Sequence, residues 1–184
     1  MSELADENLD LDALRRGSSG EFARLVKLHQ PIVLGLCQAM GLRGADCDDA
    51  AAEVFVAVFR SIGNFEGRSA VGTWVYRIAC RVIPKVRHKY RRRTSENLDE
   101  AHEDAAQASP LEQSSQNESH QRIWDAVASL EDRSALIVEM HYRRGLSMEE
   151  IGTIMQCPPG TVKTLLFRAR QRLKVILGQE EIPS

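Results

Sequence analysis

The chain has 184 residues, a formal net charge of −2 and 43% hydrophobic residues, enough for one medium domain or two small ones. Aromatic residues make up only 5%, and glycine and proline are sparse, so the composition favours an all-helical protein over a β-protein. The acidic start MSELADENLD does not resemble a signal peptide, and no apolar run approaches the roughly 20 residues of a membrane helix. We therefore expect a cytoplasmic protein without membrane insertion.

The four cysteines and five histidines show no spacing typical of a disulfide framework or a metal site. We expect reduced, mostly buried thiols, no bound metal and no cofactor. Charge is distributed unevenly: residues 77–93 are strongly basic, residues 94–121 contain no Lys or Arg, and the chain is basic again after Lys163. Two basic blocks separated by an acidic connector indicate two separate contacts with a polyanion.

The first third of the chain predicts two helices, which are separated by the GSSG stretch at residues 17–20 and closed by Gly41. The next helix is predicted over residues 46–62. Asp49 and Glu53 lie four positions apart and therefore share one face of this helix. They form either an acidic solvent-exposed surface or a contact with a partner protein.

A loop at residues 63–69 carries Phe65, which we expect to be exposed, and a helix over residues 71–90 follows. This helix combines Trp74 with Arg77, Arg81 and further basic residues. Aromatic side chains interleaved with arginines can stack on unpaired bases and hold a nucleic-acid backbone. The alternative is that Trp74 belongs to the core and that the arginines form a solvated face.

Pro84 falls inside this helix and predicts a kink or a break in it. Residues 94–121 are polar and acidic, which predicts a flexible linker without a packed core. The expected architecture is therefore all-α: two small helical domains, residues 1–93 and 122–184, joined by the flexible acidic linker 94–121.

The C-terminal domain is predicted to end in two helices joined by a tight turn. Ser147 and Glu150 have the spacing of a capping box, so a helix should begin at Met148. The segment Cys157-Pro158-Pro159-Gly160 should end this helix, because proline disfavours helical geometry in the residue before it. Pro159 suits the first turn of the helix that follows.

The second of these helices is apolar on one face and free of acidic residues until Glu180. This pattern favours a helix-turn-helix whose second helix enters the major groove, over a helical hairpin with a solvated basic face. The side chains outside the apolar face include Lys163, Thr164, Phe167, Arg168, Arg170 and Arg172.

Taken together, these segments resemble the extracytoplasmic-function (group 4) RNA polymerase sigma factors. The string DDAAAEVFVAVFRSIGNF resembles region 2.2 of that family, and NFEGRSAVGTWVYRIACR resembles its region 2.3–2.4. The string LSMEEIGTIMQCPPGTVKTLLFRARQRL resembles region 4.2. The resemblance covers nearly the whole chain, from about Leu11 to Leu177.

The resemblance implies a sigma factor that binds core RNA polymerase as a monomer within the holoenzyme, recognises two promoter elements and is controlled by an anti-sigma factor. In this reading Asp49 and Glu53 contact the polymerase. The residues expected to open the −10 element and hold a flipped base are Phe65, Trp74, Arg77 and Arg81. The residues expected to read the −35 element are Lys163, Thr164, Phe167 and Arg168, with Arg170 and Arg172 nearer the DNA backbone.

The chain departs from the family pattern at several positions. The family commonly has Gln at Ala52, Asn at Arg81 and Arg at Leu165, and an aromatic residue is usual near Gly72. The departure at Ala52 concerns a contact with the polymerase, and the others, together with Pro84, concern promoter preference rather than the fold.

Two alternatives stay open, a sigma-like adaptor that binds polymerase without opening DNA and a conventional helix-turn-helix regulator. The sequence contains no nucleophile–base pair, metal-ligand set or phosphate loop, so an enzyme is not predicted.

Overall fold

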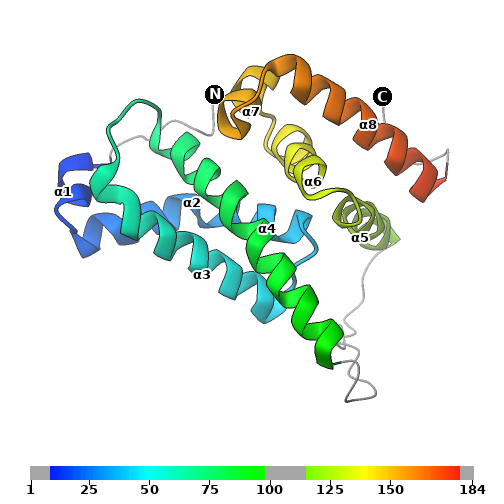
Figure 1. Ribbon diagram of the computed structural model, residues 1–184, viewed down its shortest axis with the longest axis horizontal. Coiled ribbons are helices and arrows are strands. Elements are labelled where there is room, and N and C mark those ends of the chain that lie inside the picture. Colours follow the sequence, from blue (N-terminus) through cyan, green and yellow to red (C-terminus); the bar gives the residue numbers. More distant parts are fainter. Residues whose placement is uncertain (1–8, 98–114, 179–184) are drawn as a thin grey trace.

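The computed structural model describes residues 9–97 and 115–178, and every regular element within these ranges is a helix (Figure 1). The predicted all-α fold is confirmed. Helices α1 to α4 form an N-terminal unit, and α5 to α8 form a C-terminal unit. The elements are α1 Leu11–Arg15, α2 Ser19–Ala39, α3 Gly44–Ser61, the 3-10 turn η1 Ile62–Asn64, α4 Val71–Asn97, α5 Ser115–Ala128, α6 Asp132–Val138, the π-helical turn η2 Glu139–Arg143, α7 Met148–Met155 and α8 Pro159–Leu177.

Local signals set the boundaries of the first helices. The Ser18 hydroxyl accepts a hydrogen bond from the backbone N–H of Glu21 and so caps α2. After α2, Gly41 adopts a φ of +80°, a left-handed conformation that glycine takes without steric cost. The predicted break between two helices and the closure at Gly41 are therefore confirmed, but α2 already begins at Ser19, inside the predicted separator 17–20.

The N-terminal unit is held together by apolar stripes that α2, α3 and α4 bury against one another. Each fully buried aliphatic side chain contributes about 1.5–3 kcal/mol relative to an exposed one. The side chains at the centre of this packing include Leu25 and Leu36 from α2, Val54 and Val58 from α3, and Val75 and Ile83 from α4. Burial of these stripes leaves the outer face of α3 exposed, whereas part of the outer face of α4 packs against α7.

Helix α4 runs without interruption through Pro84, so the predicted break in this helix is wrong. Pro84 has no backbone N–H to donate to the carbonyl four residues earlier, at Cys80. Ile83 and Val86 on either side of it are buried, at 0% and 3% exposure, and their packing holds the helical path. Helices α4 and α5 also extend into both ends of the predicted linker, whereas residues 98–114 lie outside the described part of the chain.

The C-terminal unit packs α6 and α7 against α8, with α5 alongside. Helix α6 continues into η2, where the backbone widens to a π-helical turn before Gly145. The sequence analysis did not predict this turn. Among the residues that the structure describes, no helix is both long enough and apolar enough to cross a membrane.

The turn between α7 and α8 forms as predicted. Ser147 and Glu150 exchange both hydrogen bonds of a capping box, at 3.1 and 2.9 Å, and α7 begins at Met148. Gln156 closes α7 with a left-handed φ of 52°, and α8 begins at Pro159. A Cβ atom added to Gly152 would lie 2.7 Å from the carbonyl oxygen of Cys157. The turn after α7 can therefore be this tight only because residue 152 is glycine.

We predict that Gly152→Ala destabilises the C-terminal unit by about 1–3 kcal/mol, because the added methyl group overlaps a backbone atom that cannot move independently. Gly160→Ala is the matched control. Nothing lies within 4 Å of its added Cβ, so it should be neutral or stabilise α8 by up to about 1 kcal/mol. Urea unfolding followed by circular dichroism measures both. Equal stability of the two variants would contradict the steric role of Gly152.

Candidate nucleic-acid and protein interfaces

Helix α8 presents an exposed basic face. Its inner face is buried through Val162, Leu166, Ala169 and Leu173, and Leu165 is half-buried. Most of the side chains predicted to read DNA point to solvent, and 59% of the Phe167 surface is exposed. Lys163, Thr164, Phe167, Arg168 and Arg172 are exposed, whereas Arg170 is half-buried.

The first turns of α8 are open to a ligand. Pro158, Pro159, Gly160 and Thr161 are all exposed, and the first turn contains no acidic residue. The positive end of the helix dipole therefore lies at an exposed turn, next to the cationic side chains of the exposed face. This is the geometry that a recognition helix requires at a DNA groove.

In the N-terminal unit, the loop residue Phe65 is buried, at 6% exposure, so the prediction that it is exposed is wrong. Its ring lies 5.0 Å from the ring of Trp74, centroid to centroid. Arg15 donates two hydrogen bonds, of 3.0 and 2.8 Å, to the carbonyl oxygen of Phe65 and so fixes the loop to α1. Phe65 thus packs against the Trp74 ring and helps to fix its position.

The structure brings Trp74, Arg77 and Arg81 together on α4. Trp74 and Arg77 are half-buried, and Arg81 is exposed. All three line a pocket of about 540 Å³. The opposite wall of this pocket belongs to the C-terminal unit and includes Ile154, Met155 and Gln156 of α7. Three of the four predicted base-holding residues therefore face the first helix of the helix-turn-helix, and Phe65 does not line the pocket.

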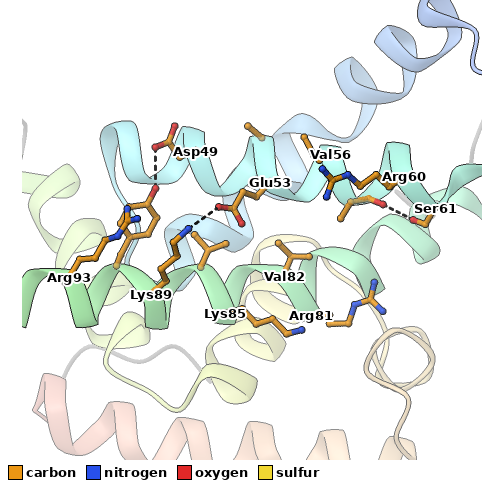
Figure 2. A pocket seen from close by; sticks show the side chains of 14 residues that line it. Asp49, Glu53, Val56, Arg60, Ser61, Arg81, Val82, Lys85, Lys89 and Arg93 are labelled. Carbon is orange, nitrogen blue, oxygen red and sulfur yellow. Dashed lines mark hydrogen bonds and ion pairs between the residues drawn. The ribbon is translucent and has the colours of Figure 1, made fainter.

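A second groove, of about 930 Å³, lies between α3 and α4 and contains both acidic residues predicted to bind a partner (Figure 2). The Tyr90 hydroxyl donates a hydrogen bond of 3.1 Å to Asp49, and Lys89 lies 4.0 Å from Glu53. Partial desolvation and the hydrogen bond to Asp49 raise the pKa of Tyr90 above its ordinary value of 10. Because the Lys89–Glu53 pair is about half exposed, it contributes little to stability.

Sequence reasoning missed the basic stripe opposite these carboxylates. Arg81, Lys85, Lys89 and Arg93 follow one another at intervals of four residues and line the α4 side of the groove. This spacing places the four side chains along one helix face, and it was the signal that could have identified them.

The fold and these surfaces define an all-helical DNA-binding protein of two units. One unit carries a helix-turn-helix, and the other carries an aromatic and basic helix beside an acidic groove. Comparison with known families agrees with this division. Residues 25–96 match the family described as Sigma-70 region 2, and residues 120–173 match Sigma-70, region 4.

Two relatives resemble the chain along nearly its whole length. The RNA polymerase sigma-H factor of Pseudomonas aeruginosa is 31% identical over 183 residues, covering 94% of each chain. The ECF RNA polymerase sigma-E factor of Haemophilus influenzae is 31% identical over 182 residues, covering 94% of this chain and 95% of the relative. The chain belongs to the extracytoplasmic-function group of the sigma-70 family of RNA polymerase sigma factors, which are transcription initiation factors.

Two solved structures share the fold. CnrH, solved in complex with the cytosolic domain of CnrY, aligns with a TM-score of 0.67 at 18% identity over 93% of this chain and 96% of that one. The sigma factor RpoE of Bartonella quintana, solved with the anti-sigma factor NepR, aligns with a TM-score of 0.64 at 20% identity over 88% and 99%.

Proposed function

We propose that this protein is an alternative sigma factor, which binds core RNA polymerase, directs it to promoters with specific −10 and −35 elements and helps to melt the DNA. The observation that carries this proposal is the presence in one chain of an exposed recognition helix and a separate aromatic and basic helix. The first suits duplex DNA and the second suits unpaired bases. A conventional helix-turn-helix regulator needs only the first.

We assign residues 1–93 to region 2, residues 122–184 to region 4 and residues 94–121 to the linker between them. In region 4, α8 reads the −35 element. Lys163, Thr164, Phe167 and Arg168 contact bases, and their exposure supports this role. Arg172 is exposed and Arg170 is half-buried, which suits contacts with phosphates at the edge of the groove.

In region 2, Trp74, Arg77 and Arg81 hold the unpaired non-template strand at the −10 element. A base stacks against the Trp74 ring, and the arginines bind phosphate or base edges. Phe65 contributes by positioning Trp74, since their rings are in contact. Arg81 is longer than the Asn common in the family and carries a charge, which favours contacts with phosphate.

Core polymerase binds the α3 side of the groove through Asp49 and Glu53, whose side chains face the groove in Figure 2. Val56 lines the same groove and is 48% exposed, and this apolar side chain beside the two carboxylates supports a protein partner. Exposed apolar residues next to charged ones are typical of interaction surfaces.

We also propose control by an anti-sigma factor and action in the cytoplasm, where the polymerase works. CnrH and RpoE were each solved with a protein partner, and in the case of RpoE that partner is an anti-sigma factor. The protein contributes no chemistry of its own and acts as a monomer within the holoenzyme.

The deciding experiment is transcription of fragmented host DNA by bacterial core polymerase with and without this protein, followed by mapping of new 5′ ends. New starts that share two upstream motifs at a fixed spacing would support the proposal. Binding to polymerase without new starts would favour the adaptor, and neither binding nor new starts would favour the conventional regulator.

We predict that Arg168→Ala lowers initiation at cognate promoters and relaxes the preference at one −35 position, because a bidentate base contact is worth about 1–3 kcal/mol. Arg172→Ala should instead weaken all promoters to a similar extent, since a phosphate contact carries no sequence information. Run-off transcription from a panel of −35 variants distinguishes the two. If both variants show the same sequence profile, Arg168 does not read bases.

Reversal of the charge at Glu53 should weaken polymerase binding by about tenfold or more, because like charges at an interface are costly. Glu53→Arg loses a half-exposed pair with Lys89 and faces the basic stripe of α4, and because these groups are exposed to solvent its stability should fall by no more than about 1 kcal/mol. Asp48→Arg is the control, an exposed neighbour on α3 that does not line the groove. Fluorescence anisotropy of labelled protein against core polymerase measures both. Equal losses would show a general charge effect instead of a docking site.

A further inference from the structure

Two of the four cysteines lie in the core of the N-terminal unit, where the end of α2 meets the start of α3. Cys37 is 0% exposed and Cys47 is 5% exposed, and both are free thiols. A buried cysteine packs like any small apolar side chain, so its distinctive property is the reactivity of the thiol. Neither residue belongs to the surfaces that we assign to DNA or to polymerase.

The backbone brings these two positions together. At the end of α2, the N–H group of Gly41 donates to the carbonyl oxygen of Gln38 at 2.9 Å. The N–H group of Leu42 donates to the carbonyl oxygen of Cys37 at 3.1 Å. This pair of bonds is a Schellman motif, and it uses the left-handed φ of +80° at Gly41. The motif reverses the chain, so that α3 begins beside the end of α2, with Cys47 in its first turn.

The two sulfur atoms lie over the same turn of α2. The Cys47 thiol is 3.9 Å from the carbonyl oxygen of Leu34, one turn before Cys37. The side chain of Cys37 also points toward this turn, because the Cα–Cβ bonds of a helix tilt toward its N-terminus. The two thiols interact there directly through a hydrogen bond. A covalent bond between them therefore needs only a short local movement.

The two thiols differ in acidity. The hydrogen bond with Cys37 lowers the pKa of Cys47 below its ordinary value of 9.0, and Arg43 adds to this effect, although burial and Asp48 oppose it. Cys47 also lies in the first turn of α3, where the positive end of the helix dipole favours a thiolate. The same hydrogen bond, together with burial, raises the pKa of Cys37. Cys47 is therefore the nucleophile of the pair.

The start of α3 gives a small oxidant a route to Cys47. Residues 43–46 are exposed, and no side chain caps the first N–H groups of this helix. An uncapped helix end opens locally at a small cost in free energy. Cys47 is thus the first of the two thiols to meet an oxidant, whereas Cys37 is enclosed.

We propose that Cys37 and Cys47 form a reversible disulfide when they meet a hydroperoxide, and that this pair is a redox site of the N-terminal unit. Disulfides in a reducing compartment are usually transient and redox-sensing, which suits a pair that is reduced at rest. The inference is independent of the proposed function, because it uses none of the residues assigned to DNA or to polymerase.

The reaction with hydrogen peroxide proceeds in two steps. The Cys47 thiolate attacks one peroxide oxygen, the O–O bond breaks, and Cys47 becomes a sulfenic acid. The leaving hydroxide takes up the proton that Cys47 had released and becomes water. The Cys37 sulfur then attacks the Cys47 sulfur, so that the S–S bond forms, the S–O bond breaks and a second water leaves with the proton of Cys37. The two sulfur atoms together lose two electrons, and the peroxide gains them.

Peptide mapping of the purified full chain after treatment with hydrogen peroxide is the first measurement. Trypsin cleaves after Arg43, so Cys37 and Cys47 fall in separate peptides, residues 28–43 and 44–60. Once remaining thiols are alkylated, the oxidised protein should yield these peptides joined to each other and lighter than their sum by two hydrogen atoms. Dithiothreitol should separate them. If the two peptides are not joined after treatment, the proposal is wrong.

Single variants separate the roles of the two thiols. Cys37→Ala should leave Cys47 as a sulfenic acid, which dimedone traps, and Cys47→Ala should leave Cys37 reduced. Cys157→Ala is the matched control, a half-buried cysteine outside the pair, and it should form the disulfide as the wild type does. If Cys37 is oxidised in Cys47→Ala as fast as in the wild type, Cys47 is not the nucleophile and the proposed reaction is wrong.

Unfolding in urea is the second measurement, and two cysteines that only pack would not change it. The disulfide joins positions ten residues apart and restricts the unfolded chain, so peroxide should raise the urea midpoint of the wild type and of Cys157→Ala. Dithiothreitol should reverse the rise, and Cys37→Ala should show none. A disulfide that lowers the midpoint would strain the native fold. The pair would then be a site of oxidative damage, and the proposal would be overturned.

Circular dichroism checks that each variant retains the helical content of the wild type. The peptide map of the wild type needs no variant, so the proposal stays testable even if a substitution in the core prevents folding.

Discussion

This structure depends on supplying hydrogen-bond donors to the backbone carbonyl groups at the carboxyl ends of its helices. A protein built from short helices has many of them, and each needs a donor or water. In this chain arginine side chains supply several of these donors, both within the units and between them. The pairs are Arg15 with Phe65, Arg43 with Gln38, Arg133 with Met155, Arg77 with Thr153 and Arg87 with Ala128. Arg77, which we propose to bind DNA, is thus also one of the arginines that hold the helices in place, and on α4 the two roles would compete.

The local geometry of the helix-turn-helix could be predicted from the sequence because its signals act over a few residues. Ser147 and Glu150 specify the start of α7 through reciprocal hydrogen bonds, and Pro159 specifies the first turn of α8. Helical periodicity likewise identified the buried face of α8. The exposed face, with Arg168 and its neighbours, follows from that assignment without any knowledge of distant contacts.

The errors concern contacts between residues far apart in the chain. Phe65 lies in a loop, which suggested exposure, but Trp74 and Arg15 enclose it from α4 and α1. Pro84 was expected to kink or break a helix, but the helix is unbroken, and buried neighbours on both sides hold it against the core. Nothing local in the sequence links Arg87 with Asp132, because their partnership arises only when the two units meet.

The hydroxyl group of Thr164 has a further consequence for the choice of base. It donates its hydrogen to the carbonyl of Gly160, one turn earlier in α8, at 2.9 Å. A hydroxyl committed in this way offers only lone pairs to a ligand. In a major groove it would pair with the amino group of adenine or cytosine and meet repulsion from the oxygen of guanine or thymine. Lys163 and Arg168 have the opposite character, since they can only donate. If α8 reads bases as proposed, adjacent positions of this helix would therefore select bases by opposite hydrogen-bonding polarity.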